Sequence, residues 1–124
     1  LTQNPTPPES GEFRVPFRRD AHQLIIPAQM NGENHNLMID TGSPVTVTDS
    51  NRNLTTSDGL FRFRLGDKEL ELHAYSQDLS VLADLDVAAI LGGDFLQQWV
   101  VTVDPAKNVL LFSGVTHSSD INEP

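Results

Sequence analysis

The sequence predicts an all-β domain, and three features of the chain support this prediction. Between residues 13 and 112, apolar runs of about four to seven residues alternate with Gly, Asn and Asp, as short strands and turns do in all-β domains. Two segments have the pattern of a strand pair around a tight turn. One run, residues 87–91, is apolar throughout, which is expected of a strand buried on both faces.

The first strand pair is predicted between residues 23–29 and residues 37–39. Asn31 and Gly32 lie between the two runs, and both residue types tolerate the positive φ angles that tight hairpin turns need. The second run ends at Ile39. We therefore expect this hairpin to place Asp40 at the end of a strand.

The second strand pair is predicted between residues 61–65 and residues 68–72. Both runs alternate polar and apolar residues about Gly66 and Asp67, which suit a type II′ turn. This turn sets the register, so one face carries ion pairs and the other packs. The expected partners are Arg64 with Glu69, Arg62 with Glu71, Phe63 with Leu70, and Phe61 with Leu72.

The apolar run at residues 87–91 ends at Gly92 and Gly93, where we expect the chain to bend sharply. A short helix is predicted near residues 94–99, with Asp94 as its N-cap or first-turn acid. A last hairpin then pairs residues 100–103 with residues 109–112.

The chain of 124 residues has the length of one domain. Residues 1–12 hold three of the eight prolines and are expected to form a Pro-rich linker; residues 13–113 form the domain, and residues 114–124 form a polar tail. A Pro-rich amino terminus suits a domain that is anchored, secreted or cut from a longer precursor. We therefore expect an extracytoplasmic location.

Composition excludes several classes of function. A net charge of -9 repels nucleic acid, and the absence of cysteine excludes thiol catalysis. No apolar run approaches the roughly 20 residues that span a bilayer, so we expect no membrane insertion. The histidines lack the spacing of a metal site, and we expect no metal; they are His22, His35, His73 and His117.

The candidate site is the run Asp40, Thr41, Gly42 and Ser43. A carboxylate that follows an apolar strand and precedes Thr, Gly and Ser lies on a tight turn, where amides and hydroxyls can support its charge. The alternative is an ordinary surface turn, because Asp, Gly and Ser are common turn residues.

A second element favours the site interpretation. Residues 89–92 read Ala-Ile-Leu-Gly, and residues 94–96 read Asp-Phe-Leu. In this order of motifs the chain resembles the retropepsin-like aspartic peptidases, which carry an Asp-Thr/Ser-Gly loop after an apolar strand, a later apolar-apolar-Gly element beside it, and a short helix. The resemblance covers roughly residues 23–112 and implies a closed acid-protease barrel, with one lobe per chain.

The resemblance implies an aspartic endopeptidase that acts on a peptide or protein. Two carboxylates must share a proton and a water, and the chain has one Asp-Thr-Gly motif, so a homodimer with one Asp40 from each copy is implied. No metal or organic cofactor is required. Thr41 would bond across the dimer, Gly42 would allow close approach of backbone, and Ser43 could donate to the carboxylate.

The later element has a role in the same site by this resemblance. Ile90 and Leu91 would pack behind the Asp40 loop and line the substrate cleft, and Gly92 would allow the bend. The alternative for Ile90 and Leu91 is a plain core position.

One feature departs from the family pattern. Active members cover the cleft with a β-hairpin flap between the Asp-Thr-Gly loop and the later hairpin, and only residues 49–59 are available for it here. No clear flap hairpin fits this segment, so either it forms a reduced lid or the residues of a flap are missing from this chain. A catalytically inactive binding or assembly module on the same fold is therefore the alternative function.

Overall fold

The computed structural model describes residues 12–20 and 22–114. The elements follow in the order β1 (Phe13–Pro16), β2 (Arg18–Asp20), β3 (Gln23–Met30), β4 (Glu33–Ile39), β5 (Val47–Asp49), β6 (Leu60–Leu65), β7 (Lys68–His73), β8 (Tyr75–Gln77), η2 (Ser80–Leu85), β9 (Val87–Leu91), α1 (Gly93–Leu96), β10 (Trp99–Asp104) and β11 (Val109–Gly114). The predicted all-β class is confirmed.

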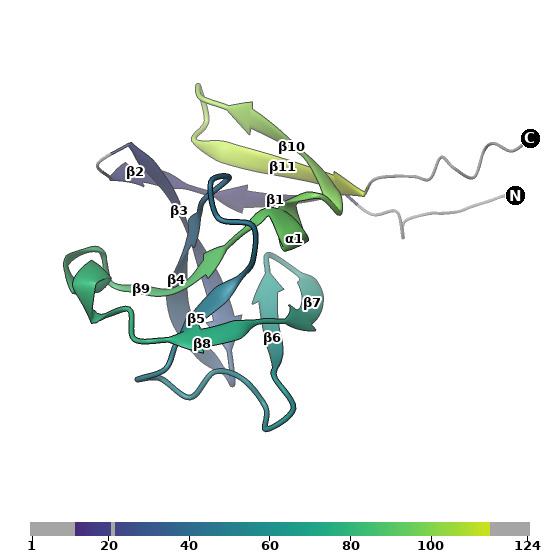
Figure 1. Cartoon of the computed structure of the whole chain (residues 1–124). Coiled ribbons are helices and arrows are strands. Elements are labelled where there is room, and N and C mark those ends of the chain that lie inside the picture. Colours follow the sequence, from purple (N-terminus) through teal and green to yellow (C-terminus); the bar gives the residue numbers. More distant parts are fainter. Residues whose placement is uncertain (1–11, 21, 115–124) are drawn as a thin grey trace, which may run out of the picture.

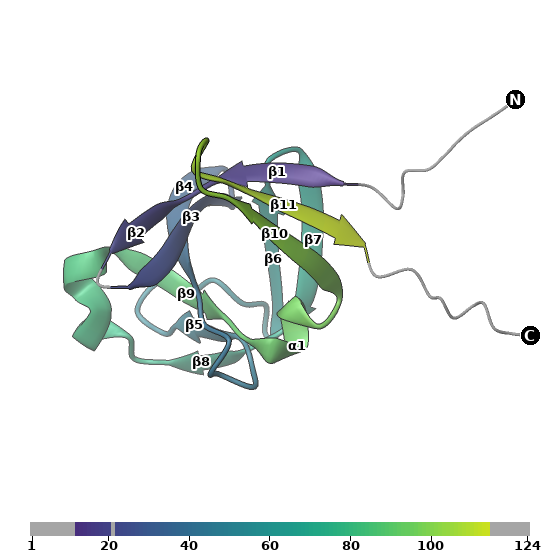
Figure 2. The same cartoon turned by 90° about the horizontal axis from the view of Figure 1, so that it is seen from above.

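The strands form two sheets. The smaller sheet has the order β1-β11-β10, and the larger has the order β7-β6-β3-β4-β9-β5-β8, with β2 paired to β3. Figure 1 shows the smaller sheet above the larger one. Seen from above in Figure 2, the larger sheet curls like the wall of a barrel.

The first hairpin has the predicted turn. Met30 pairs with Glu33, and the two residues between them have positive φ angles, 55° at Asn31 and 79° at Gly32. Positive φ at both central positions defines the turn that matches the twist of paired strands. β4 therefore ends at Ile39, directly before Asp40.

The second hairpin has the predicted register at every position. β6 pairs with β7 so that Arg62 lies opposite Glu71 and Phe63 opposite Leu70. The φ angle of Gly66 is 59°, and Asp67 is not among the residues with positive φ, as a type II′ turn requires. Phe61 and Phe63 point into the core, and the arginines stay at the surface.

β9 lies in the middle of the larger sheet. It runs parallel to β4 and antiparallel to β5, and four of its five residues are buried, as the apolar run predicted. The helix that follows is shorter than expected. α1 spans Gly93–Leu96 with Gly92 at its N-cap, and Asp94 is a first-turn acid. Trp99 belongs to β10, because its ring packs beside Phe13 in the core.

The apolar interior has two parts. The main cluster fills the space between the two sheets, and its largest fully buried side chains include Phe61, Phe63, Phe95, Phe112 and Leu91. A second, smaller cluster joins Ile25, Met38 and Val87 with the partly buried Leu82, Leu85 and Ile90.

Three elements were not predicted: β1, β8 and η2. Arg18 and Arg19 lie in β2 and are exposed, so this strand carries a solvated face. The predicted linker and tail lie outside the described residues, except that Glu12 precedes β1 and Gly114 ends β11. Within the described ranges, no helix is long and apolar enough to cross a membrane.

Candidate active site

Asp40 lies half-buried where β4 ends and the site loop begins. Its backbone N–H donates to the carbonyl of Leu91 at 3.0 Å, so β9 holds the residue on one side. Its carboxylate oxygen Oδ1 accepts a hydrogen bond of 2.9 Å from the N–H of Gly42. This bond fixes the direction of the carboxylate.

The other loop residues have distinct positions. A Cβ on Gly42 would lie 3.2 Å from Asp40 Oδ1, so glycine leaves this oxygen its space. Thr41 is exposed, and its side chain makes no hydrogen bond within the part of the chain that the structure describes. Ser43 Oγ donates to the carbonyl of Val45 at 2.7 Å. A hydroxyl has one hydrogen to donate, so Ser43 does not donate to the Asp40 carboxylate.

The second loop is locked onto the first by backbone bonds. The N–H of Gly93 donates to the Ser43 carbonyl at 2.7 Å, and the N–H of Asp94 donates to the Pro44 carbonyl at 3.0 Å. A Cβ on Gly92 would lie 2.3 Å from the Val45 carbonyl oxygen. Only glycine fits at this bend, because the two backbones touch.

A buried polar pair completes this lock. Thr46 is fully buried; its Oγ1 donates to Asp94 Oδ1 at 2.7 Å, and its N–H donates to Asp94 Oδ2 at 2.9 Å. The same Oγ1 accepts a bond of 3.2 Å from the N–H of Gly92. The Asp94 carboxylate also accepts from the N–H of Phe95. The polar groups at the bend are therefore satisfied without water.

Ile90 and Leu91 point to opposite sides of β9. Leu91 is fully buried in the main cluster behind the loop. Ile90 is partly exposed and packs in the second cluster, beside Met38 of β4. Ile90 thus lies on the same face of the sheet as Met38, which precedes Asp40 by two residues.

Residues 50–59 contain no flap hairpin. This segment makes turns and a single bridge, from Thr55 to Phe61, before β6 begins. Figure 1 shows the 40–46 loop and this segment at opposite ends of β5.

The described residues hold no cluster that could bind a metal ion. No group of three or more His, Cys, Asp or Glu side chains comes together in residues 12–20 and 22–114.

Comparison with solved structures finds the same architecture. The chain is similar to a retropepsin-like aspartic protease from Rickettsia conorii, with 16% identity, a TM-score of 0.51, and 84% of this chain and 90% of that chain covered. It is also similar to the retroviral protease-like domain of Ddi1 from Leishmania major, with 14% identity, a TM-score of 0.55, and 81% and 98% covered. The chain has the retropepsin-like fold.

The retropepsin-like fold is thus shown by structure, at low sequence identity. No family model matches the chain, and no curated protein matches it. Identities of 14% and 16% establish the fold alone. The activity must therefore be argued from the residues of this chain.

Sequence reasoning missed the partner of Asp94. The position of Thr46 between Val45 and Val47 was only a weak signal, since a threonine in an apolar strand is common. The two residues are also 48 positions apart in the sequence, so no local pattern links them.

Proposed function

We propose that this chain is an aspartic endopeptidase that acts as a homodimer. The observation that carries the proposal is the Asp40 carboxylate, which is half-exposed at a strand end, bonded by the N–H of Gly42, and set on a loop fastened to β9 and α1. In a retropepsin-like fold this loop holds the carboxylate in a fixed position, and catalysis needs a reacting group that is held in this way.

Each copy contributes one carboxylate to the proposed dyad. Two carboxylates that close cannot both ionise, so the pair shares one proton. The ionised Asp40 takes a proton from the attacking water, and the protonated Asp40 gives its proton to the carbonyl oxygen, which forms a tetrahedral diol. As the C–N bond breaks, the first Asp40 passes the proton it gained to the leaving amine, and a diol hydroxyl returns a proton to the second. Thr41, exposed at the loop tip, is free to bond to the partner's loop, and Ile90 offers an apolar surface to the substrate.

The edge of β10 is the surface we propose for the dimer. β10 is the outer strand of the smaller sheet, and its Val100 and Val103 are 54% and 40% exposed. Antiparallel pairing of two copies about Val101 sets Val100 opposite Thr102 of the partner subunit and extends the sheet across the twofold axis. β10 starts soon after α1, which bonds to the Asp40 loop, so a partner here lies beside the site.

The test is turnover of a peptide library by the purified chain, with a pepstatin-type inhibitor as control. Asp40→Asn is expected to lower turnover about a thousandfold or more, because it removes the acid and the base together. Asp67→Asn, in an exposed hairpin turn, is the matched control and should cleave as the wild type does. Full activity in Asp40→Asn would sink the proposal.

The dimer has its own readout. Val100→Lys changes an exposed residue, so the fold should persist while sedimentation shifts from dimer to monomer and turnover falls at low protein concentration. Val81→Lys, at a position 86% exposed on η2, is the matched control. A Val100→Lys protein that remains a dimer contradicts the β10 surface.

A catalytically inactive binding module is the second candidate, and the missing flap hairpin in residues 50–59 favours it. This candidate predicts that the wild type and Asp40→Asn bind the same peptides with equal affinity and that neither cleaves them.

A further inference from the structure

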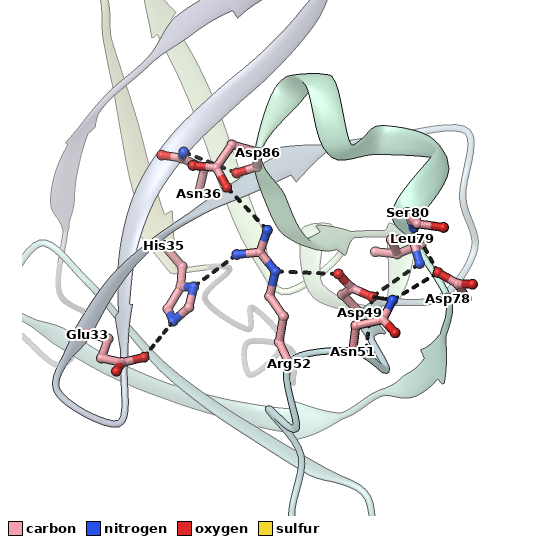
Figure 3. Close-up of polar contacts among 10 residues, drawn as sticks. All are labelled: Glu33, His35, Asn36, Asp49, Asn51, Arg52, Asp78, Leu79, Ser80 and Asp86. Atoms are coloured by element: carbon pink, nitrogen blue, oxygen red, sulfur yellow. Dashed lines mark hydrogen bonds and ion pairs between the residues drawn. The ribbon is translucent and has the colours of Figure 1, made fainter.

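Arg52 joins three separate parts of the chain. Its Nε lies 3.4 Å from Asp49 Oδ2, its Nη1 lies 3.3 Å from His35 Nδ1, and its Nη2 lies 3.2 Å from Asp86 Oδ1. Figure 3 shows the guanidinium between His35 of β4, Asp49 of β5 and Asp86, which precedes β9. Its backbone N–H also donates to the Asp49 carbonyl at 3.0 Å.

The contact with His35 fixes the charge state of the imidazole. A guanidinium can only donate hydrogen bonds, so Nδ1 of His35 must accept one. The ring hydrogen then lies on Nε2, which is 3.5 Å from Glu33 Oε1. Only a neutral His35, with its hydrogen on Nε2, satisfies both contacts.

We propose that the contact between Arg52 and His35 is a pH-sensitive latch on the segment that joins β5 to β6. Protonation of His35 would place an N–H and a positive charge 3.3 Å from the guanidinium, where an accepting lone pair is needed. The latch is therefore closed while His35 is neutral and opens when His35 takes up a proton.

Few charged groups face His35. The charged groups that face it are Arg52 and Glu33, and the Glu33 side chain is 75% exposed, so its attraction for the protonated ring is screened. Ala28 of β3 lies opposite His35, and β9 places Val87 beside Asn36; neither carries charge.

Two aspartates act on His35 through Arg52. Asp86 is exposed and binds the far nitrogen of the guanidinium. Burial raises the pKa of Asp49, but hydrogen bonds from the N–H groups of Asn51 and Leu79 and from the side chains of Asn51 and Arg52 outweigh it and hold the pKa below its usual range. Asp49 therefore stays ionised while His35 changes charge.

Opening of the latch would change only the part of the segment between Arg52 and Leu54. Asn51 remains bonded to Asp49 and Asp78, so the start of the segment stays in place. Arg52 loses one of its three side-chain partners, and the chain from Arg52 onward gains freedom. Leu54, buried in the main cluster, limits this freedom at the other end.

The consequence for activity rests on the proposed function. A dyad that shares one proton works on the acidic side of neutrality. The latched segment is the one that lies between the Asp40 loop and the later hairpin, where the related peptidases carry their flap. Acid would then free this segment at the same pH at which the dyad is ready to act.

The experiment measures exchange of the Arg52 amide hydrogen by NMR in the Asp40→Asn variant, which removes any dependence on catalysis. After correction for intrinsic rates, we expect exchange to be about tenfold faster at pH 5 than at pH 7.5, since one charge-assisted hydrogen bond is lost. The neutral-pH spectrum should show the His35 hydrogen on Nε2. A hydrogen on Nδ1 overturns the proposal.

Three added substitutions separate the latch from a general effect of acid. His35→Asn places an amide oxygen where Nδ1 accepts and does not titrate, so exchange should stay slow at both pH values. Arg52→Ala should exchange fast at both. His73→Asn, at an exposed position of β7, should keep the wild-type response. Equal pH responses in wild type and His35→Asn overturn the latch, and this comparison needs only variants that keep Arg52.

Discussion

The two ends of β5 are held by different chemistry. At the Asp40 end, backbone N–H groups of Gly93 and Asp94 bond to carbonyls of Ser43 and Pro44, and the buried Thr46 closes the junction. At the other end, a carboxylate and a guanidinium, Asp49 and Arg52, collect partners from several loops. Among the described residues, no histidine makes a hydrogen bond at the first junction, whereas His35 contacts Arg52 at the second.

The two junctions are expected to differ in their dependence on pH. Backbone bonds and a glycine contact do not change between pH 5 and 8, so the Asp40 loop keeps its shape over this range. A latch through an imidazole can change in the same range. The junction held by backbone bonds thus lies beside the proposed reacting group, and the proposed latch lies at the start of residues 50–59.

The largest effect is expected at Gly92. Gly92→Ala places a Cβ 2.3 Å from the Val45 carbonyl oxygen and 2.7 Å from that of Ser43, so one backbone must move. We expect a loss of about 3 kcal/mol or more in the free energy of unfolding, measured by urea denaturation. Gly93→Ala is the matched control, because its nearest atom would be 3.5 Å away. Similar losses in both variants would show that the close contact does not decide the outcome.

The sequence predicts what local patterns encode. The β6–β7 register follows from alternation about Gly66 and Asp67, and every predicted pair is found. The place of Asp40 follows from the apolar run before it and the turn residues after it. These predictions succeed because strand period and turn chemistry act over a few residues.

The sequence does not reveal contacts between distant polar residues. The bond between Thr46 and Asp94 and the contact between Arg52 and His35 depend on how strands are ordered in the sheet. η2 was missed because none of its residues is buried and it therefore lacks an apolar period. The helix end was misplaced because Trp99 was read as part of the helix, whereas packing against Phe13 draws it into β10.

An intermediate loss of unfolding free energy is expected when Thr46 is replaced. Thr46→Val keeps the shape of the side chain but removes the hydroxyl that donates to Asp94 and accepts from Gly92. The loss should be about 2 kcal/mol in the free energy of unfolding, because two buried partners lose a bond. Thr48→Val is the matched control: Thr48 is as buried, but its hydroxyl makes one long bond of 3.4 Å, to Tyr75. A Thr48→Val variant that loses as much as Thr46→Val would contradict this account of the junction.

The smallest change in unfolding free energy is expected at Asp49. Its size should depend on pH, because Asp49 carries a carboxylate. Hydrogen bonds hold the pKa of Asp49 below its value of 3.8 in an unfolded chain, despite the opposing effect of burial. When a carboxyl has a lower pKa in the folded state than in the unfolded chain, it stabilises the fold. This stabilisation is complete at pH values above the pKa of the unfolded chain, and it is lost as the pH falls through the pKa of the folded state. At neutral pH, Asp49→Asn should therefore cost about 1 kcal/mol in the free energy of unfolding.

Unfolding free energies measured at acidic pH test whether the Asp49 carboxylate stabilises the fold. Below about pH 4, the wild type should lose its advantage over Asp49→Asn, so the two curves of unfolding free energy against pH converge. Asp67→Asn, which changes an exposed turn residue, should run parallel to the wild type through this range. If the Asp49→Asn curve also stays parallel to the wild type, the carboxylate is not stabilised by the bonds to Asn51, Leu79 and Arg52. The far junction would then be held by packing around Leu54 and Leu79 alone.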